Sequence, residues 1–253
     1  MFGFLEYEFM VRALLGGILA GALAPALGVF IYLRRLSLIA DTLAHVAFMG
    51  VAIGLFVNVF PPFIALVTSA TAAAAIEMLR SRKLLPGDAA LAVFLYTSLA
   101  IAVVVIGFSD GFGADLFAYL FGSILTISTT DLWLLVGLAI ATIGFVVFFF
   151  SELAQTSFDV DMARTNGIRV NLINVGLAVL TGATVTLSMR VVGVLLIGAL
   201  IIVPVIAALR ITVGLRQTVA VAMALGVISA VLGLITAWHT DMAPGGAVVL
   251  TAV

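Results

Sequence analysis

Charged side chains are scarce in this chain, and their scarcity excludes most soluble folds. Only 9% of its 253 residues are Lys, Arg, Asp or Glu, and 64% are hydrophobic. Soluble domains average roughly 25% charged and about 45–50% apolar residues. So few charges cannot cover a globule of this size with polar groups, which rules out a soluble enzyme, a disordered chain and a coiled coil. The remaining class is a membrane-embedded protein, which we expect to be all-α.

Cysteine is absent and lysine occurs once, and both facts remove classes of chemistry. Without cysteine there is no disulfide, thiolate metal site or thiol nucleophile. The single Lys83 follows Arg82, so no Gly-Lys-Ser/Thr loop is present to hold a nucleotide phosphate. The His-Glu-x-x-His motif does not occur, so a zinc-dependent membrane protease is poorly supported. A net charge of −1 without any block of basic residues makes nucleic acid an unexpected partner.

Long apolar runs predict a polytopic helix bundle that forms a single transmembrane domain over residues 1–253. A helix needs about 20 apolar residues to cross the hydrocarbon layer. The pair Pro61-Pro62 divides one long run into two spans. We therefore expect about eight spans, at roughly 11–33, 38–57, 62–80, 89–108, 131–151, 171–189, 192–210 and 217–237.

Basic residues fall in alternate loops, and this pattern predicts which side of the membrane each loop faces. The loops after the first, third, fifth and seventh spans hold Arg34, Arg35, Arg80, Arg82, Lys83, Arg164, Arg169, Arg210 and Arg216. The other loops hold only Arg12 and Arg190. Because loops rich in Lys and Arg face the cytoplasm, we expect the N-terminus to lie outside.

Two apolar segments are too short to be counted as membrane spans. The outer segment 110–130 contains an apolar piece, Leu116–Ile127, that is too short to cross the membrane twice. We interpret it as a short interfacial or re-entrant half-helix buried against the bundle, since unpaired backbone is not tolerated facing lipid. The tail Gly245–Val253 resembles the start of a ninth span but is too short to cross. It is either a truncated span or a half-span that packs on the bundle.

Asp41 and His45 are the strongest candidates for a functional site. They stand at i and i+4 on one face of the second span. Ionisable residues at that depth are costly and usually face the bundle interior or a water-filled path. A carboxylate and an imidazole one turn apart suit a divalent ion such as zinc or manganese. A buried Asp–His hydrogen bond that only fixes helix packing is the alternative.

A second candidate is the polar cytoplasmic stretch Ser157–Val170. Ser157 is a plausible N-cap, Asp159 and Asp161 suit the positive end of a helix dipole, and Gly167 suits the helix end. The pattern predicts a short helix, which either docks a soluble partner or is a solvated connector.

Two weaker signals lie near the C-terminus. Gly193, Gly198 and Pro204 interrupt the seventh span, and interrupted helices often line transport paths. In the outer loop after the eighth span, His239 and Asp241 are a further possible cation-receiving pair, although such short matches are often incidental.

Several of these motifs, in this order, resemble the permease subunit of the zinc/manganese-type uptake transporters powered by ATP-binding cassettes. The segment Arg34–His45 resembles the family's RRxSLIGDxxxH element, with Ala40 where glycine is usual. The matches continue through the outer segment DLFAYLFGSILTIS, the cytoplasmic SFDxxxARxxG helix, the RVVGxLLxxALLxxPA run and the closing DxPxGPxIVLxA element, where Gly246 replaces proline.

The resemblance implies a transport subunit of a bacterial or archaeal plasma membrane, not an enzyme. Two permease copies would form the pathway, and we expect them to be identical in sequence. ATP would be hydrolysed on separate cytoplasmic ATPase subunits, and an external metal-binding protein would deliver the metal. The cargo would be zinc or manganese, with iron also possible, and no cofactor would be bound permanently. Asp41 and His45 would bind or gate the ion. The cytoplasmic helix would contact the ATPase through Asp159, Ala163, Arg164 and Gly167.

Two other functions stay open on the residues alone. A permease of the related architecture could carry a metal chelate of the siderophore or cobalamin type, but it would need a wide apolar vestibule without ionic ligands midway. A membrane scaffold that does not transport could use Ser157–Gly167 only for docking. The ligand pair Asp41 and His45 argues against the first of these.

Overall fold

The computed structural model describes residues 7–108, 113–123, 127–240 and 242–253, and these form an all-helical bundle. Every element in the described ranges is a helix. They are α1 (Glu8–Leu33), α2 (Ile39–Phe56), α3 (Pro61–Ser81), α4 (Gly87–Gly107), α5 (Gly113–Phe121), α6 (Thr129–Phe148), α7 (Phe150–Phe158), α8 (Val160–Thr165), α9 (Val170–Val192), α10 (Ile197–Ile211), α11 (Leu215–Thr240) and α12 (Pro244–Ala252).

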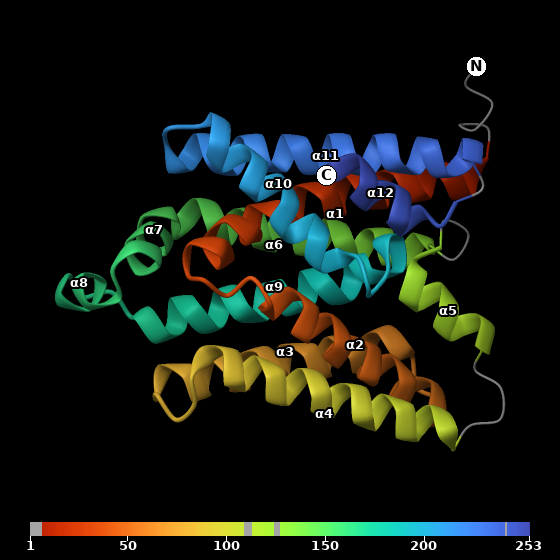
Figure 1. Ribbon diagram of the computed structural model, residues 1–253, viewed down its shortest axis with the longest axis horizontal. Coiled ribbons are helices and arrows are strands. Elements are labelled where there is room, and N and C mark those ends of the chain that lie inside the picture. Colours follow the sequence, from red (N-terminus) through yellow and green to blue (C-terminus); the bar gives the residue numbers. More distant parts are fainter. Residues whose placement is uncertain (1–6, 109–112, 124–126, 241) are drawn as a thin grey trace.

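The long helices run roughly along one axis of the molecule, and the short helices gather at its ends (Figure 1). α1, α2 and α9 are the most buried of the long helices, whereas α4 and α6 are the most exposed. The small helix α8 projects at one end, together with α7 and the turns α3–α4 and α10–α11. α5 lies at the opposite end. This arrangement agrees with the loop assignment from the charges, in which α8 and α5 belong to opposite sides. The outward N-terminus stays a prediction.

Seven of the eight expected spans are helices long and apolar enough to cross a membrane, and the eighth is shorter than expected. The seventh span was predicted at 192–210, but α10 begins only at Ile197. Gly193 has a φ of 92°, which ends α9 and turns the chain before α10 starts. With 15 residues, α10 spans about 22 Å, less than the hydrocarbon thickness of about 30 Å.

A short helix is present in the outer segment, although it covers Gly113–Phe121 and not the predicted Leu116–Ile127, and a second short helix is present at the tail. α5 is a nine-residue helix within the outer segment. α12 is a nine-residue helix at the tail, and it packs closely on α11, where a Cβ at Gly233 would meet the backbone of Val248.

Small residues bring the backbones of α1 and α11 into direct contact. A Cβ atom at Gly21 would lie 2.6 Å from the carbonyl oxygen of Gly226, and one at Gly17 would lie 2.7 Å from Leu234. Close backbone approach gives helices in lipid their van der Waals contact, because exclusion from water does not drive association there. Gly17 and Gly21 are therefore packing residues.

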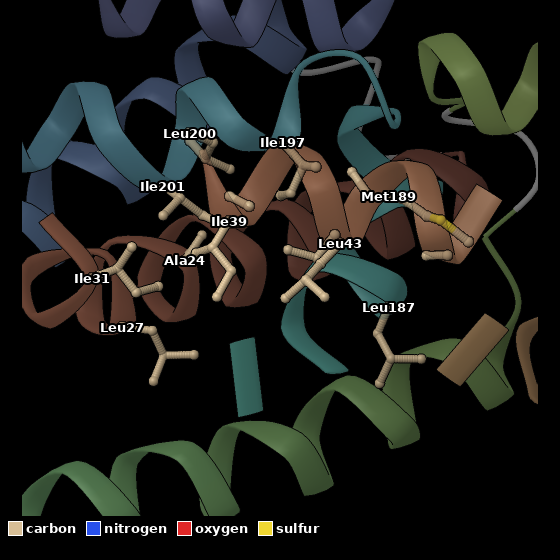
Figure 2. Close-up of a cluster of buried hydrophobic side chains, with 14 of the residues drawn as sticks. Ala24, Leu27, Ile31, Ile39, Leu43, Leu187, Met189, Ile197, Leu200 and Ile201 are labelled. Atoms are coloured by element: carbon tan, nitrogen blue, oxygen red, sulfur yellow. The ribbon is translucent and has the colours of Figure 1, made fainter. Parts of the chain in front are cut away.

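Apolar side chains from four helices meet around the start of α2. Figure 2 shows Ile39 and Leu43 of α2 near Ile197 and Leu200 of α10, beside residues of α1 and α9. All four are buried. On a helix with 100° per residue, Asp41 and His45 lie on a different face of α2 from Ile39 and Leu43. The apolar face thus fixes α2 in the bundle and sets the direction in which the polar face points.

We expect Gly21→Ala to destabilise the bundle, because the added methyl group would collide with backbone that cannot move aside. Overpacking of this kind typically costs about 1–3 kcal/mol. The apparent unfolding temperature in detergent should fall by several degrees. The matched control is Gly137→Ala in α6, where a Cβ meets nothing within 4 Å. Equal unfolding temperatures of the two variants would show that the α1–α11 contact is not tight.

Candidate functional site

Asp41 and His45 lie on adjacent turns near the start of α2, as the spacing predicts. The start of α2 is set back toward the middle of the molecule, further from the α8 end than the start of α4 is (Figure 1). The two side chains do not form an ion pair with each other. The alternative of a packing hydrogen bond between them is therefore not what the structure contains.

Both side chains are half-buried, so their shared face of α2 is not sealed within this chain. The Nδ1 atom of His45 is buried and has no hydrogen-bond partner. An unsatisfied buried ring nitrogen is costly unless something else pairs with it. Among the described residues no group of three or more His, Asp or Glu side chains comes together. Asp41 and His45 therefore stay a predicted pair of ligands, a carboxylate and an imidazole.

The Asp41 carboxylate rests directly on the backbone of Gly198. A Cβ at Gly198 would overlap the Oδ1 atom, so only glycine leaves room there. Gly198 is the second residue of α10, and the positive end of a helix dipole favours a carboxylate at that position. The break before α10 therefore has a local consequence, since it brings a helix start and a glycine to Asp41.

On the opposite end, α5 is fixed to the α9–α10 connection. Val194 donates a backbone hydrogen bond to the Tyr119 carbonyl (3.0 Å), and Ser123 donates one to the Arg190 carbonyl (3.2 Å). The Arg190 guanidinium lies 5.7 Å from the Tyr119 ring centre and forms an ion pair with buried Asp131. One of the two basic residues outside the loops predicted to be cytoplasmic is thus paired within the protein. The other, Arg12, pairs with Glu8.

The second candidate cation pair is described only in part. His239 is exposed near the end of α11, and its Nδ1 atom lies 2.8 Å from the Ile235 carbonyl oxygen. Asp241 lies outside the described residues. Its pairing with His239 stays a prediction.

The cytoplasmic helix forms, but it starts later than predicted. Ser157 is not its N-cap, because it belongs to α7 and its hydroxyl donates to the Leu153 carbonyl (2.6 Å). Asp159 takes that role, and its side chain accepts hydrogen bonds from the backbone N–H groups of Asp161 and Met162 (both 2.9 Å). The chain leaves the helix at Gly167, which has a φ of 80°.

The predicted docking residues differ in exposure. Asp159, Arg164 and Gly167 are exposed, whereas Ala163 is fully buried within the chain. Two exposed apolar side chains were missed by the sequence analysis. Phe158 is 71% exposed and Met162 is 63% exposed, and both belong to the segment around α8.

Arg34, at the end of α1, holds the two stretches of chain that carry α8. Its guanidinium donates to the side-chain oxygens of Thr156 (2.7 Å) and Ser157 (3.1 Å) in α7 and of Asn174 (2.7 Å) in α9. Burial lowers the pKa of Arg34 to about 10, although the charge of Glu77 partly opposes that shift. The sequence signal for this contact was Asn174, a polar amide within an apolar span.

Comparison with known proteins agrees with this geometry. The chain is 33% identical over 245 residues to the high-affinity zinc uptake system membrane protein ZnuB of Haemophilus influenzae, covering 96% of this chain and 94% of that protein. It is 31% identical over 248 residues to the manganese transport system membrane protein MntC of Halalkalibacterium halodurans, covering 98% and 85%.

A solved structure has the same fold. PsaBC from Streptococcus pneumoniae, in complex with a Fab, superposes with a TM-score of 0.87 at 31% identity, covering 99% of this chain and 90% of that one. The model of the ABC 3 transport family matches residues 6–253. The chain is therefore a member of the ABC 3 transport family, and its relatives include membrane proteins of zinc and manganese transport systems.

Proposed function

We propose that this chain is the permease subunit of an ATP-binding-cassette importer and carries a divalent transition-metal ion past Asp41 and His45. The observation that carries the proposal is this carboxylate–imidazole pair on one face of α2, half-buried and with the Nδ1 atom of His45 unpartnered. Relatives named for zinc and for manganese transport support the same cargo class. One carboxylate and one imidazole suit either ion, so the pair does not select between them.

The exposure of this face supports a pathway formed by two copies of the chain. Half-exposed ionisable side chains facing acyl chains would be costly. A second copy whose Asp41 and His45 face the first pair would cover both. It would also raise the number of side-chain ligands from two to four, the coordination number typical of zinc. The ion would lose water on entering and gain these ligands only briefly, because a tight closed site would trap it.

The exposed segment around α8 supports docking of a separate ATPase subunit at the cytoplasmic end. Asp159, Arg164 and Gly167 keep their proposed role, and Phe158 and Met162 join them as apolar contacts. Because Ala163 is buried, its role is to pack α8 against the chain. An external metal-binding protein would deliver the ion at the opposite end.

Replacing either ligand should abolish transport. In cells that lack their own importers, Asp41→Asn or His45→Ala should lower zinc or manganese uptake by about 10- to 100-fold, the usual loss when a metal site is damaged. The control is Asp88→Asn, which removes an exposed carboxylate from the first turn of α4. Unchanged uptake at equal amounts of membrane protein would contradict the proposed role, and competition by a chelate but not by free metal would favour a chelate permease.

Gly198→Ala should impair transport without touching either ligand. The added methyl group would push the Asp41 carboxylate away from the start of α10. Uptake should fall by about tenfold, the factor that about 1.4 kcal/mol represents. The control is Gly144→Ala in α6, where a Cβ meets nothing within 4 Å. Wild-type uptake by Gly198→Ala would mean that the position of Asp41 on α10 is unimportant.

Met162→Asp should weaken capture of the ATPase, because a carboxylate would replace an exposed apolar side chain at the proposed interface. The measurement is co-purification of the ATPase with the permease in detergent. Leu172→Asp, at another exposed apolar position just after α8, is the control. Equal recovery of the ATPase with both variants would place the docking surface elsewhere.

A further inference from the structure

Among the described residues, the side chain of Arg34 joins the C-terminal end of α1 by hydrogen bonds to both segments that flank α8. It contacts Thr156 and Ser157 in the last turn of α7 and Asn174 in the first turns of α9. α8 and its connections occupy the short stretch between these two segments. A guanidinium suits this position because its planar fork presents donors in several fixed directions.

The same residue begins the connection that leads to the ligand pair. Only residues 34–38 separate α1 from α2, and this connection is held by backbone hydrogen bonds from Leu36 to Ile31 (3.1 Å) and from Ile39 to Leu36 (2.9 Å). Asp41 follows in the first turn of α2. The path from the flanks of α8 to Asp41 is therefore short, and backbone hydrogen bonds hold it at Leu36 and Ile39.

The charge of Arg34 makes these contacts costly to break. Its acceptors are neutral oxygens, and the nearest charges that act on it are the attraction of Glu77 and the repulsion of Arg80. Glu77 is only 2% exposed and is engaged by Arg80 through two hydrogen bonds (2.9 and 2.8 Å). Losing an acceptor would leave a partly buried cation under-satisfied, which is more costly than losing a neutral hydrogen bond.

We propose that Arg34 is the positioning residue that transmits displacement of α8 to the α1–α2 connection, and so couples ATP hydrolysis to movement of Asp41 and His45. This inference rests on the proposed function. Moving α8 together with its flanking turns must carry the guanidinium with it or break three hydrogen bonds. Loss of Arg34 should therefore separate hydrolysis from transport, with the ATPase still bound.

The test uses the assembled complex of permease, ATPase and external binding protein in proteoliposomes, and measures metal ions imported per ATP hydrolysed. Arg34→Ala and Asn174→Leu should each lower this ratio by about tenfold, as expected when a hydrogen bond to a charged group is lost. Asn174→Asp keeps an acceptor for the guanidinium and should stay near the wild-type ratio. Arg35→Ala, at the adjacent exposed arginine, is the matched control.

A wild-type ratio in Arg34→Ala would overturn the inference, as would equal loss in Asn174→Asp and Asn174→Leu, since the acceptor would then be irrelevant. A purely structural role would lower the unfolding temperature and the hydrolysis rate in parallel with uptake, at a constant ratio, and would also overturn it. The proposed function fails separately: in that case the wild-type complex imports no metal, or Asp41→Asn imports as much as wild type.

Discussion

The energetic constraint on this molecule is that a carboxylate and an imidazole must be kept among helices that lipid surrounds. Ionisable groups at that depth are tolerated where they face other polar groups, water or an ion. Here the bundle supplies one wall of such an environment, with Asp41 on the start of α10 and the apolar side of α2 packed on α1 and α10. It leaves the other side of the pair half-exposed. The proposed covering partner and the proposed ion site would thus have the same origin.

Close contacts at glycine residues hold the other helices of the bundle tightly together around the half-exposed pair Asp41 and His45. The α1–α11 contact at Gly21 and Gly226 and the α3–α9 contact at Gly182 leave no room for a side chain. At Gly182 the carbonyl also accepts a hydrogen bond from Ser69 (3.1 Å). Helices packed at this distance move as units, because a close-packed interface has few intermediate arrangements.

Features that depend on neighbouring residues could be predicted from the sequence, whereas contacts between distant parts of the chain could not. Apolar run length located seven long helices to within a few residues, and i, i+4 spacing placed Asp41 and His45 on one face. Gly193 signalled the break before α10, whereas Gly198 and Pro204 lie inside that helix. The packing of Gly193 against α5 is encoded by no local pattern. Ser157 resembled an N-cap because its hydroxyl suits one, but α7 continues through it and Asp159 caps α8 instead. The acceptors of Arg34 come from positions more than a hundred residues away, so only the fold brings them together.

A pathway with two ligands per chain also constrains how transport is driven. An ion held by four side chains from two copies is released when the copies separate or rotate by a small distance, since metal–ligand bonds tolerate deviations of only about 0.2 Å. Small displacements at the ligand pair are therefore sufficient, provided that they are reliably linked to the cytoplasmic end. A short hydrogen-bonded connection gives that link better than a long flexible loop, because little of the movement is absorbed on the way. The five residues between α1 and α2, fixed at one end by Arg34 and followed at the other by Asp41, have this property.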